Sequence, residues 1–231
     1  MSLEKLSLTI NMEGFAEYIS YCGYDEHKIH NIFYGLVDGF ETTTSLNTLC
    51  LAIFWNYHFV NTCSKLFASL NFVFSSNKSV RTLTVTVTVN DFHIEVFPEI
   101  FGEGLAKNSS VTTLSLTINE YGEGQSHIPL VLDRSGVFEH LTRNTSVTTF
   151  NLTLNSSREV SDDWLLDLRN AVKKNSSLTT LTMKVNNHCA TGESRLYDFS
   201  KLLIESTSLS LLELDVSFYG KESGCHKVLI H

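Results

Sequence analysis

Seven segments of the chain repeat one pattern of apolar and polar positions. Each opens with a serine and an apolar residue, and three residues later apolar and polar positions begin to alternate, as in residues 110–118 (Ser-Val-Thr-Thr-Leu-Ser-Leu-Thr-Ile). Alternation of period two, filled by Leu, Val, Ile and Thr, predicts a strand with one buried face. The segments start 43, 34, 31, 36, 31 and 31 residues apart, at Ser2, Ser45, Ser79, Ser110, Ser146, Ser177 and Ser208.

The half of each unit that precedes the next serine has a different period. From the second serine onward, one apolar residue stands five positions before the serine and another stands nine positions before it. A spacing of four places two side chains on one stripe of a helix. We therefore expect a helix between successive strands, with core-facing pairs Leu36 and Phe40, Leu70 and Phe74, Phe101 and Leu105, Val137 and Leu141, Leu168 and Val172, and Phe199 and Leu203.

This alternation of strands and helices predicts the architecture. Because every strand is joined to the next through a helix, the strands run parallel. One unit cannot bury its apolar face alone, whereas stacked units form a continuous core. We therefore expect an α/β fold: a curved solenoid, or horseshoe, forming one domain over residues 1–231, with an inner parallel sheet of about seven strands and outer helices.

The repeated phrase resembles the leucine-rich repeat, whose core is Leu-x-x-Leu-x-Leu-x-x-Asn. The asparagine position holds Phe54, Thr88 and Ser217 in three copies and an asparagine in four: Asn11, Asn119, Asn155 and Asn186. In that family the asparagine bonds the backbone of neighbouring turns, so the resemblance implies this structural role for the four. The residue before each of them is also apolar, which we interpret as a strand that continues further than in the family. Length and helix content are similar to the ribonuclease-inhibitor-like class, and the phrases resemble the repeat region of invertebrate NLR-like (NACHT) receptors.

Composition narrows the classes of function. A formal charge of -8 argues against nucleic acid as the partner, and no apolar run approaches the length of a spanning helix. The N-terminus lacks the apolar block of a signal peptide. The five cysteines are irregularly spaced, which disfavours a secreted disulfide framework. We expect no cofactor and no membrane span.

The polar strand positions are the candidate binding surface. On the concave face predicted for the solenoid, alternation exposes Thr84, Thr86, Ser115, Thr117, Asn151, Thr153, Thr182 and Lys184, with Glu213 and Asp215 in the last copy. A shallow field of hydroxyl groups suits an extended protein surface better than a small apolar ligand, which requires a pocket. The alternative is that threonine is simply a good and soluble strand former.

Four Asn-x-Ser sequons occupy one repeat position, two residues before the serine: Asn77, Asn108, Asn144 and Asn175. They are possible glycosylation sites. They also stand where the expected helices end, and asparagine is a common residue at the C-terminal end of a helix. The helix-end interpretation explains the regular placement without a sugar.

Other residue clusters carry weaker signals. The neighbouring cysteines and histidines, such as Cys22 with His27, lack paired metal-ligand spacing, so we expect no metal site and no catalytic residues. Gly102 and Gly104 flank Glu103 without the Lys-Ser/Thr of a phosphate-binding loop, which indicates turn glycines. The insertion in the first unit is rich in aromatic residues, and insertions in repeat arrays often contact partners: Phe15, Tyr18, Tyr21 and Tyr24.

Together these patterns predict a non-enzymatic protein-binding module. The resemblance implies the sensor or partner-binding region of an intracellular, cytoplasmic NLR-like innate immune protein. One alternative is a secreted or cell-surface glycosylated recognition domain. Another is a GTPase activator, for which Arg158 after the fifth strand is the candidate arginine. Both ends of the chain are expected to expose apolar core, which suggests a fragment of a longer protein.

Overall fold

The fold is a single sheet with helices on one of its faces. The computed structural model describes residues 3–11, 39–40, 43–56, 70–90, 103–120, 137–156, 163–187, 208–218 and 226–230. The strands of this part are β1 (Lys5–Asn11), β2 (Thr48–Asn56), β3 (Thr82–Asn90), β4 (Thr113–Glu120), β5 (Thr149–Ser156), β6 (Thr180–Asn187), β7 (Leu211–Phe218) and β8 (His226–Ile230). The helices are α5 (Val137–Arg143) and α6 (Asp163–Lys174), with shorter helical segments at 70–76 and 103–107.

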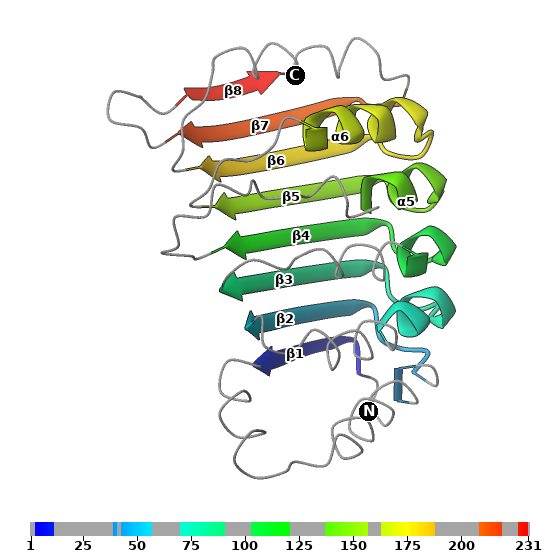
Figure 1. Cartoon of the computed structure of the whole chain (residues 1–231). Coiled ribbons are helices and arrows are strands. Elements are labelled where there is room, and N and C mark those ends of the chain that lie inside the picture. Colours follow the sequence, from blue (N-terminus) through cyan, green and yellow to red (C-terminus); the bar gives the residue numbers. More distant parts are fainter. Residues whose placement is uncertain are drawn as a thin grey trace.

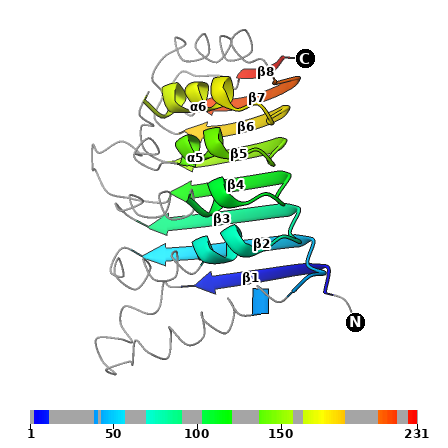
Figure 2. The ribbon, with the colours of Figure 1, turned by 90° about the vertical axis from the view of Figure 1, so that its right-hand side faces the viewer.

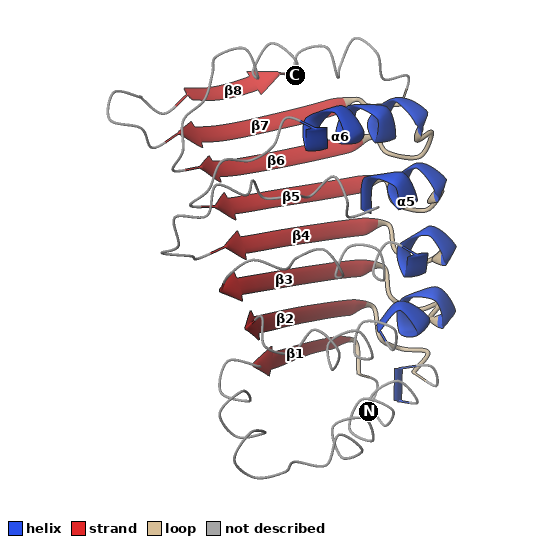
Figure 3. Ribbon diagram, viewed as in Figure 1, coloured by secondary structure: helices blue, strands red, loops and turns tan. Residues whose placement is uncertain are grey.

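The strands lie side by side in chain order, and β1 to β7 are all parallel (Figure 1). The helices gather near the ends at which the strands begin and lie in front of the sheet when it is viewed from that side (Figures 2 and 3). This is the α/β solenoid that the repeat predicts, with parallel strands in one layer and helices in the other.

The register confirms the alignment of the seven repeats. One apolar position forms an unbroken row across the parallel strands: Leu6, Leu49, Leu83, Leu114, Phe150, Leu181 and Leu212. In β4 and β5 partly exposed and buried residues alternate along the whole strand, as expected of a strand with one buried face. Insertions between strands therefore leave the pairing unchanged, because the apolar alternation sets the register.

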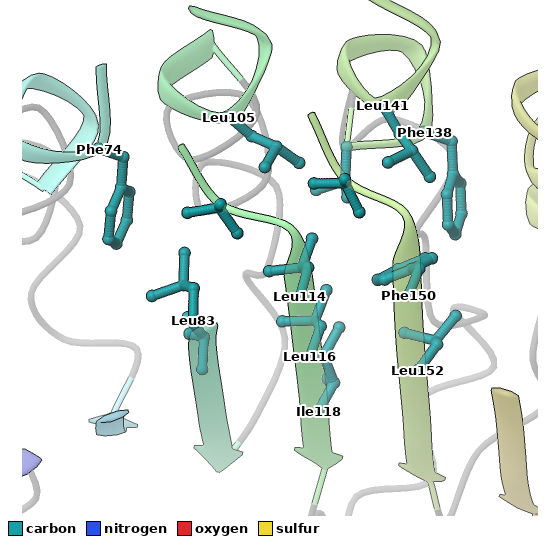
Figure 4. Close-up of a cluster of buried hydrophobic side chains, with 14 of the residues drawn as sticks. Phe74, Leu83, Leu105, Leu114, Leu116, Ile118, Phe138, Leu141, Phe150 and Leu152 are labelled. Atoms are coloured by element: carbon teal, nitrogen blue, oxygen red, sulfur yellow. The ribbon is translucent and has the colours of Figure 1, made fainter. Parts of the chain in front are cut away.

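The core fills the space between the sheet and the helices. The predicted helical stripe is confirmed wherever it falls in the described part, since these side chains are at most 7% exposed: Phe40, Leu70, Phe74, Leu105, Val137, Leu141, Leu168 and Val172. Figure 4 shows Leu105, Phe138 and Leu141 pointing toward side chains of β4 and β5 such as Leu114 and Phe150. Leu36, Phe101, Phe199 and Leu203 lie outside the described residues.

Gly104 differs from the turn glycine that the sequence suggests. It lies within the helical segment 103–107 and is buried. A Cβ added at Gly104 would lie 2.6 Å from Asn71 Oδ1 and 2.7 Å from the backbone oxygen of Asn71. The glycine therefore permits two neighbouring helical segments to approach closely.

The last strand was not expected from the sequence. β8 pairs with β7 in the antiparallel direction, with Val228 opposite Leu214. The tail therefore adds a strand beside β7, where the sequence analysis expects an uncovered end. An antiparallel neighbour fits here because residues 219–225 are the whole connection between the two strands, and a parallel crossover needs a dozen or more residues.

Candidate functional site

The face of the sheet that points away from the helices carries the candidate binding residues. We call it the open face and define it by the alternate strand positions that are not packed in the core. Every predicted binding residue lies on it and is partly or fully exposed: Thr84, Thr86, Ser115, Thr117, Asn151, Thr153, Thr182, Lys184, Glu213 and Asp215. The register groups them into rows that cross the sheet, for example Thr86, Thr117, Thr153 and Lys184.

One end of the open face is charged. Lys184 Nζ lies 3.8 Å from Asp215 Oδ2, between β6 and β7. Thr182 donates a hydrogen bond of 3.3 Å to Glu213 Oε2 on the neighbouring strand. Both charged partners of the ion pair are well exposed, so it contributes little to stability. These groups make the β6–β7 end of the open face charged.

The asparagines that the leucine-rich-repeat resemblance singles out have a different role from the one it implies. Asn186 Nδ2 donates to Asn155 Oδ1 at 2.6 Å, and Asn155 Nδ2 donates to Asn119 Oδ1 at 2.6 Å. Asn119 Nδ2 in turn donates to Thr88 Oγ1 at 3.2 Å. These side chains bond one another along the open face, rather than the backbone, because the strands continue through this position. The backbone of Asn11 occupies the same register position, and its side chain lies outside the described part.

A second set of asparagines bonds the backbone inside the molecule. Asn144 Nδ2 donates to the carbonyl oxygens of Leu105 (2.7 Å) and Asn108 (3.0 Å), which belong to the preceding repeat. Its Oδ1 accepts the backbone N–H groups of Ser146 (2.9 Å) and Val147 (2.7 Å). Asn108 and Asn175 repeat this arrangement, and so does Asn77 with one donated bond, to the carbonyl oxygen of Phe40. We call the four the buried asparagine ladder.

The ladder bears on the predicted glycosylation sites, because its members are the four sequon asparagines that share one repeat position. They are between 1% and 4% exposed, and the Nδ2 atom that would carry a sugar already donates to carbonyl oxygens. Each backbone N–H also bonds the carbonyl oxygen four residues earlier, as with Asn175 and Ala171 (2.8 Å), so the residue ends its helix. A sugar on Nδ2 is incompatible with this arrangement, and the helix-end interpretation accounts for the placement.

Sequence reasoning also missed a buried polar pair at the ends of β4 and β5. Ser156 Oγ donates to Glu120 Oε2 at 2.5 Å, and the two residues are 2% and 5% exposed. Their alternation places them on the core side of the sheet, opposite the amide row of Asn119 and Asn155. Glu120 can be recognised as a buried polar residue in the sequence only once the strand is known to extend this far.

Several features named from the sequence lie outside the described residues. These are the aromatic insertion, the cysteine and histidine neighbours such as Cys22 and His27, and Arg158. Among the residues that the structure describes, no group of His, Cys, Asp and Glu could hold a metal ion. The described helices include none that is long and apolar enough to span a membrane.

Comparison with known proteins does not identify the function of the chain. No protein-family model matches the chain, and no curated protein matches it. Among solved structures, the chain is similar to the actin-binding site 2 of leiomodin-1, with 14% identity over 75% of this chain and 88% of that chain, at a TM-score of 0.44. A likeness of this extent assigns no activity or ligand.

Proposed function

We propose that the chain is a non-catalytic recognition module that binds a partner protein on its open face. The observation that carries the proposal is the continuous field of exposed hydroxyl and amide side chains across β3 to β6, contributed by one strand position after another. A sheet face of this kind provides many weak contacts over an extended area. Catalysis would instead need a nucleophile, a base and an orienting group within reach of one another.

The size of the face supports a protein partner. Seven parallel strands at about 4.8 Å spacing make the sheet about 29 Å wide, and the rows of the open face span about 20 Å along each strand. The planar area is then about 600 Å², against about 800 Å² per partner in a standard protein interface. The open face would therefore supply most of the contact area of a standard interface, and the loops that flank the strands would supply the rest.

A display selection tests this proposal. The whole chain would be used to select binders from a random-peptide library, and the binders would then be measured against Thr117→Arg/Thr153→Arg on the open face. The matched control is Leu166→Arg, because Leu166 is 53% exposed on α6 at the helical side. We expect the open-face variant to lose the selected binders and the control to retain them. Equal binding to both variants would place recognition elsewhere on the molecule.

We also propose, from the repeat resemblance, that the module is the sensor or partner-binding region of an intracellular NLR-like innate immune protein. The buried asparagine ladder supports an unglycosylated, cytoplasmic setting over a secreted one, because the Nδ2 atoms of its four sequon asparagines are all engaged in the fold. The test is the mass of the native protein before and after enzymatic removal of N-linked sugars. A mass well above 26.0 kDa that does not change supports a larger intracellular parent. Loss of several sugar chains would contradict it.

A further inference from the structure

Building on the proposed function, we propose that the partner meets the centre of the open face with an uncharged, hydrogen-bonding surface. The contacts are made by free threonine hydroxyls in two rows. The first row contains Thr48, Thr82, Thr113, Thr149 and Thr180, and the second contains Thr86, Thr117 and Thr153. We call them the hydroxyl rows.

The hydroxyl rows differ from the hydroxyl groups just before the strands in having no internal partner within the described part of the chain. At the position just before each strand the hydroxyls are engaged: Thr148 Oγ1 donates to the carbonyl oxygen of Thr112 at 3.2 Å, and Thr179 Oγ1 donates to that of Thr148 at 3.1 Å. Within the described part of the chain, none of the eight hydroxyls in the hydroxyl rows forms a hydrogen bond. Each can therefore donate one bond and accept others from a ligand.

The rows are also geometrically regular. Neighbours within a row are in register on adjacent strands, so they repeat at about 4.8 Å, and the two rows lie four residues apart along each strand. Threonine is branched at Cβ, which restricts its χ1 angle and fixes the direction of the hydroxyl. A partner therefore meets an ordered array and loses little side-chain entropy from this side of the interface.

The centre of the face is uncharged although the chain is not. On β2 to β5 the open face has sixteen positions whose side chains the structure describes, four on each strand, and none is charged: Thr48, Cys50, Ala52, Phe54, Thr82, Thr84, Thr86, Thr88, Thr113, Ser115, Thr117, Asn119, Thr149, Asn151, Thr153 and Asn155. At the 18% of charged residues in the whole chain, about three would be expected. The described charges of the open face lie at its margins, on β1 (Lys5) and on β6 and β7 (Lys184, Glu213, Asp215).

This charge distribution selects the chemistry of the partner. A partner carboxylate or ammonium buried against the hydroxyl rows would lose its hydration without gaining a counter-ion, and such burial is costly. A surface of Ser, Thr, Asn, Gln or main-chain groups would instead exchange water for the hydroxyls at little cost. The neutral centre thus favours uncharged partners and discriminates against charged ones. Ion pairs with the partner are confined to the two margins of the face, at β1 and at β6–β7.

The test uses the binders selected from the random-peptide library. It distinguishes a failure of the proposed function from a failure of this inference. Absence of binders that depend on the open face would remove the proposed function itself. Given such binders, we expect the segments that contact the face to lack charged residues and to be rich in Ser, Thr, Asn and Gln. We also expect the affinity to change less than about threefold when the salt rises from about 0.05 M to about 0.5 M. Binders that are consistently acidic or basic, with a steep salt dependence, would overturn the inference.

Matched substitutions locate the contacts. Thr117→Val and Thr153→Val remove a free hydroxyl at nearly constant shape, and each should weaken binding by about fivefold. Thr148→Val removes an internally bonded hydroxyl and should leave the affinity unchanged. Urea unfolding of every variant confirms that it is folded, since neither Thr117 nor Thr153 loses an internal bond. If Thr148→Val weakened binding as much as the other two, the hydroxyl rows would not be the contact residues.

Discussion

The buried asparagine ladder should dominate the stability of the repeat array, and Asn144→Ala tests this directly. The substitution removes two donated bonds, to the carbonyl oxygens of Leu105 and Asn108, and two accepted bonds, from the N–H groups of Ser146 and Val147. Asn144 is 1% exposed, so water does not easily replace the lost partner.

The magnitude follows from these four bonds. A hydrogen bond contributes about 1 kcal/mol net, and a buried group left unpaired costs about 1–3 kcal/mol. Partial relaxation reduces the sum, so we expect Asn144→Ala to lower the free energy of unfolding by about 3–5 kcal/mol. That is a large share of the roughly 5–15 kcal/mol typical of a domain. Asn77→Ala should cost less, because Asn77 donates one such bond, to the carbonyl oxygen of Phe40.

Urea unfolding followed by circular dichroism measures this change, with Thr145→Ala as the control. Thr145 lies beside Asn144 in the sequence, is exposed and forms no hydrogen bond within the described part of the chain. Its substitution should change the free energy of unfolding by less than about 0.5 kcal/mol. If Asn144→Ala and Thr145→Ala were equally mild, the ladder would contribute nothing specific and the reasoning from its contacts would fail.

Three further predictions follow from the helical side and the sequons. Gly104→Ala should destabilise the chain by about 1–3 kcal/mol, because its Cβ would overlap Asn71, whereas Gly39→Ala has no atom within 4 Å and should be neutral or mildly stabilising in the same urea titration. The hydrogen bond and charge of Lys107 lower the pKa of Glu103 below its ordinary 4.5, so a small contribution to stability is present above that value and lost as the pH falls through the folded-state pKa. Glu103→Gln should flatten this part of the pH dependence, and an unchanged profile would contradict the assignment. Chain produced in a secretory host should carry no sugar on Asn108 or Asn175 when folded, which peptide mass mapping checks.

The sequence determined the repeat and the open face, because both depend on a period-two alternation that recurs seven times. The row from Leu6 to Leu212 and the exposure of Thr117 and Thr153 follow from that alternation alone. The alternation could also have predicted that Asn119 lies on the open face. Ile118 is buried, so the next residue of a continuing strand must lie on the opposite face. The family resemblance implied a backbone contact instead, because it assumes a strand that ends earlier.

Contacts between repeats were not predictable from one unit of sequence. The close approach of Gly104 to Asn71 joins residues of successive repeats, and the pattern within either repeat does not show it. The antiparallel pairing of β8 depends on a short connection and on an available strand beside it, rather than on the repeat. Both features arise from packing between units, which a period along the chain does not encode.

Under the proposed function, stability and recognition are carried by different polar side chains of the same repeat. The buried asparagine ladder and the hydroxyls before each strand are engaged in the backbone of the neighbouring unit, as with Asn144 and Thr148. Within the described part of the chain, the hydroxyl groups of the hydroxyl rows form no hydrogen bonds. Substitutions in the hydroxyl rows can therefore alter affinity without altering the fold. Such substitutions could change which partner binds while the fold stays the same. This property suits the proposed recognition module and would be of little use to a structural spacer.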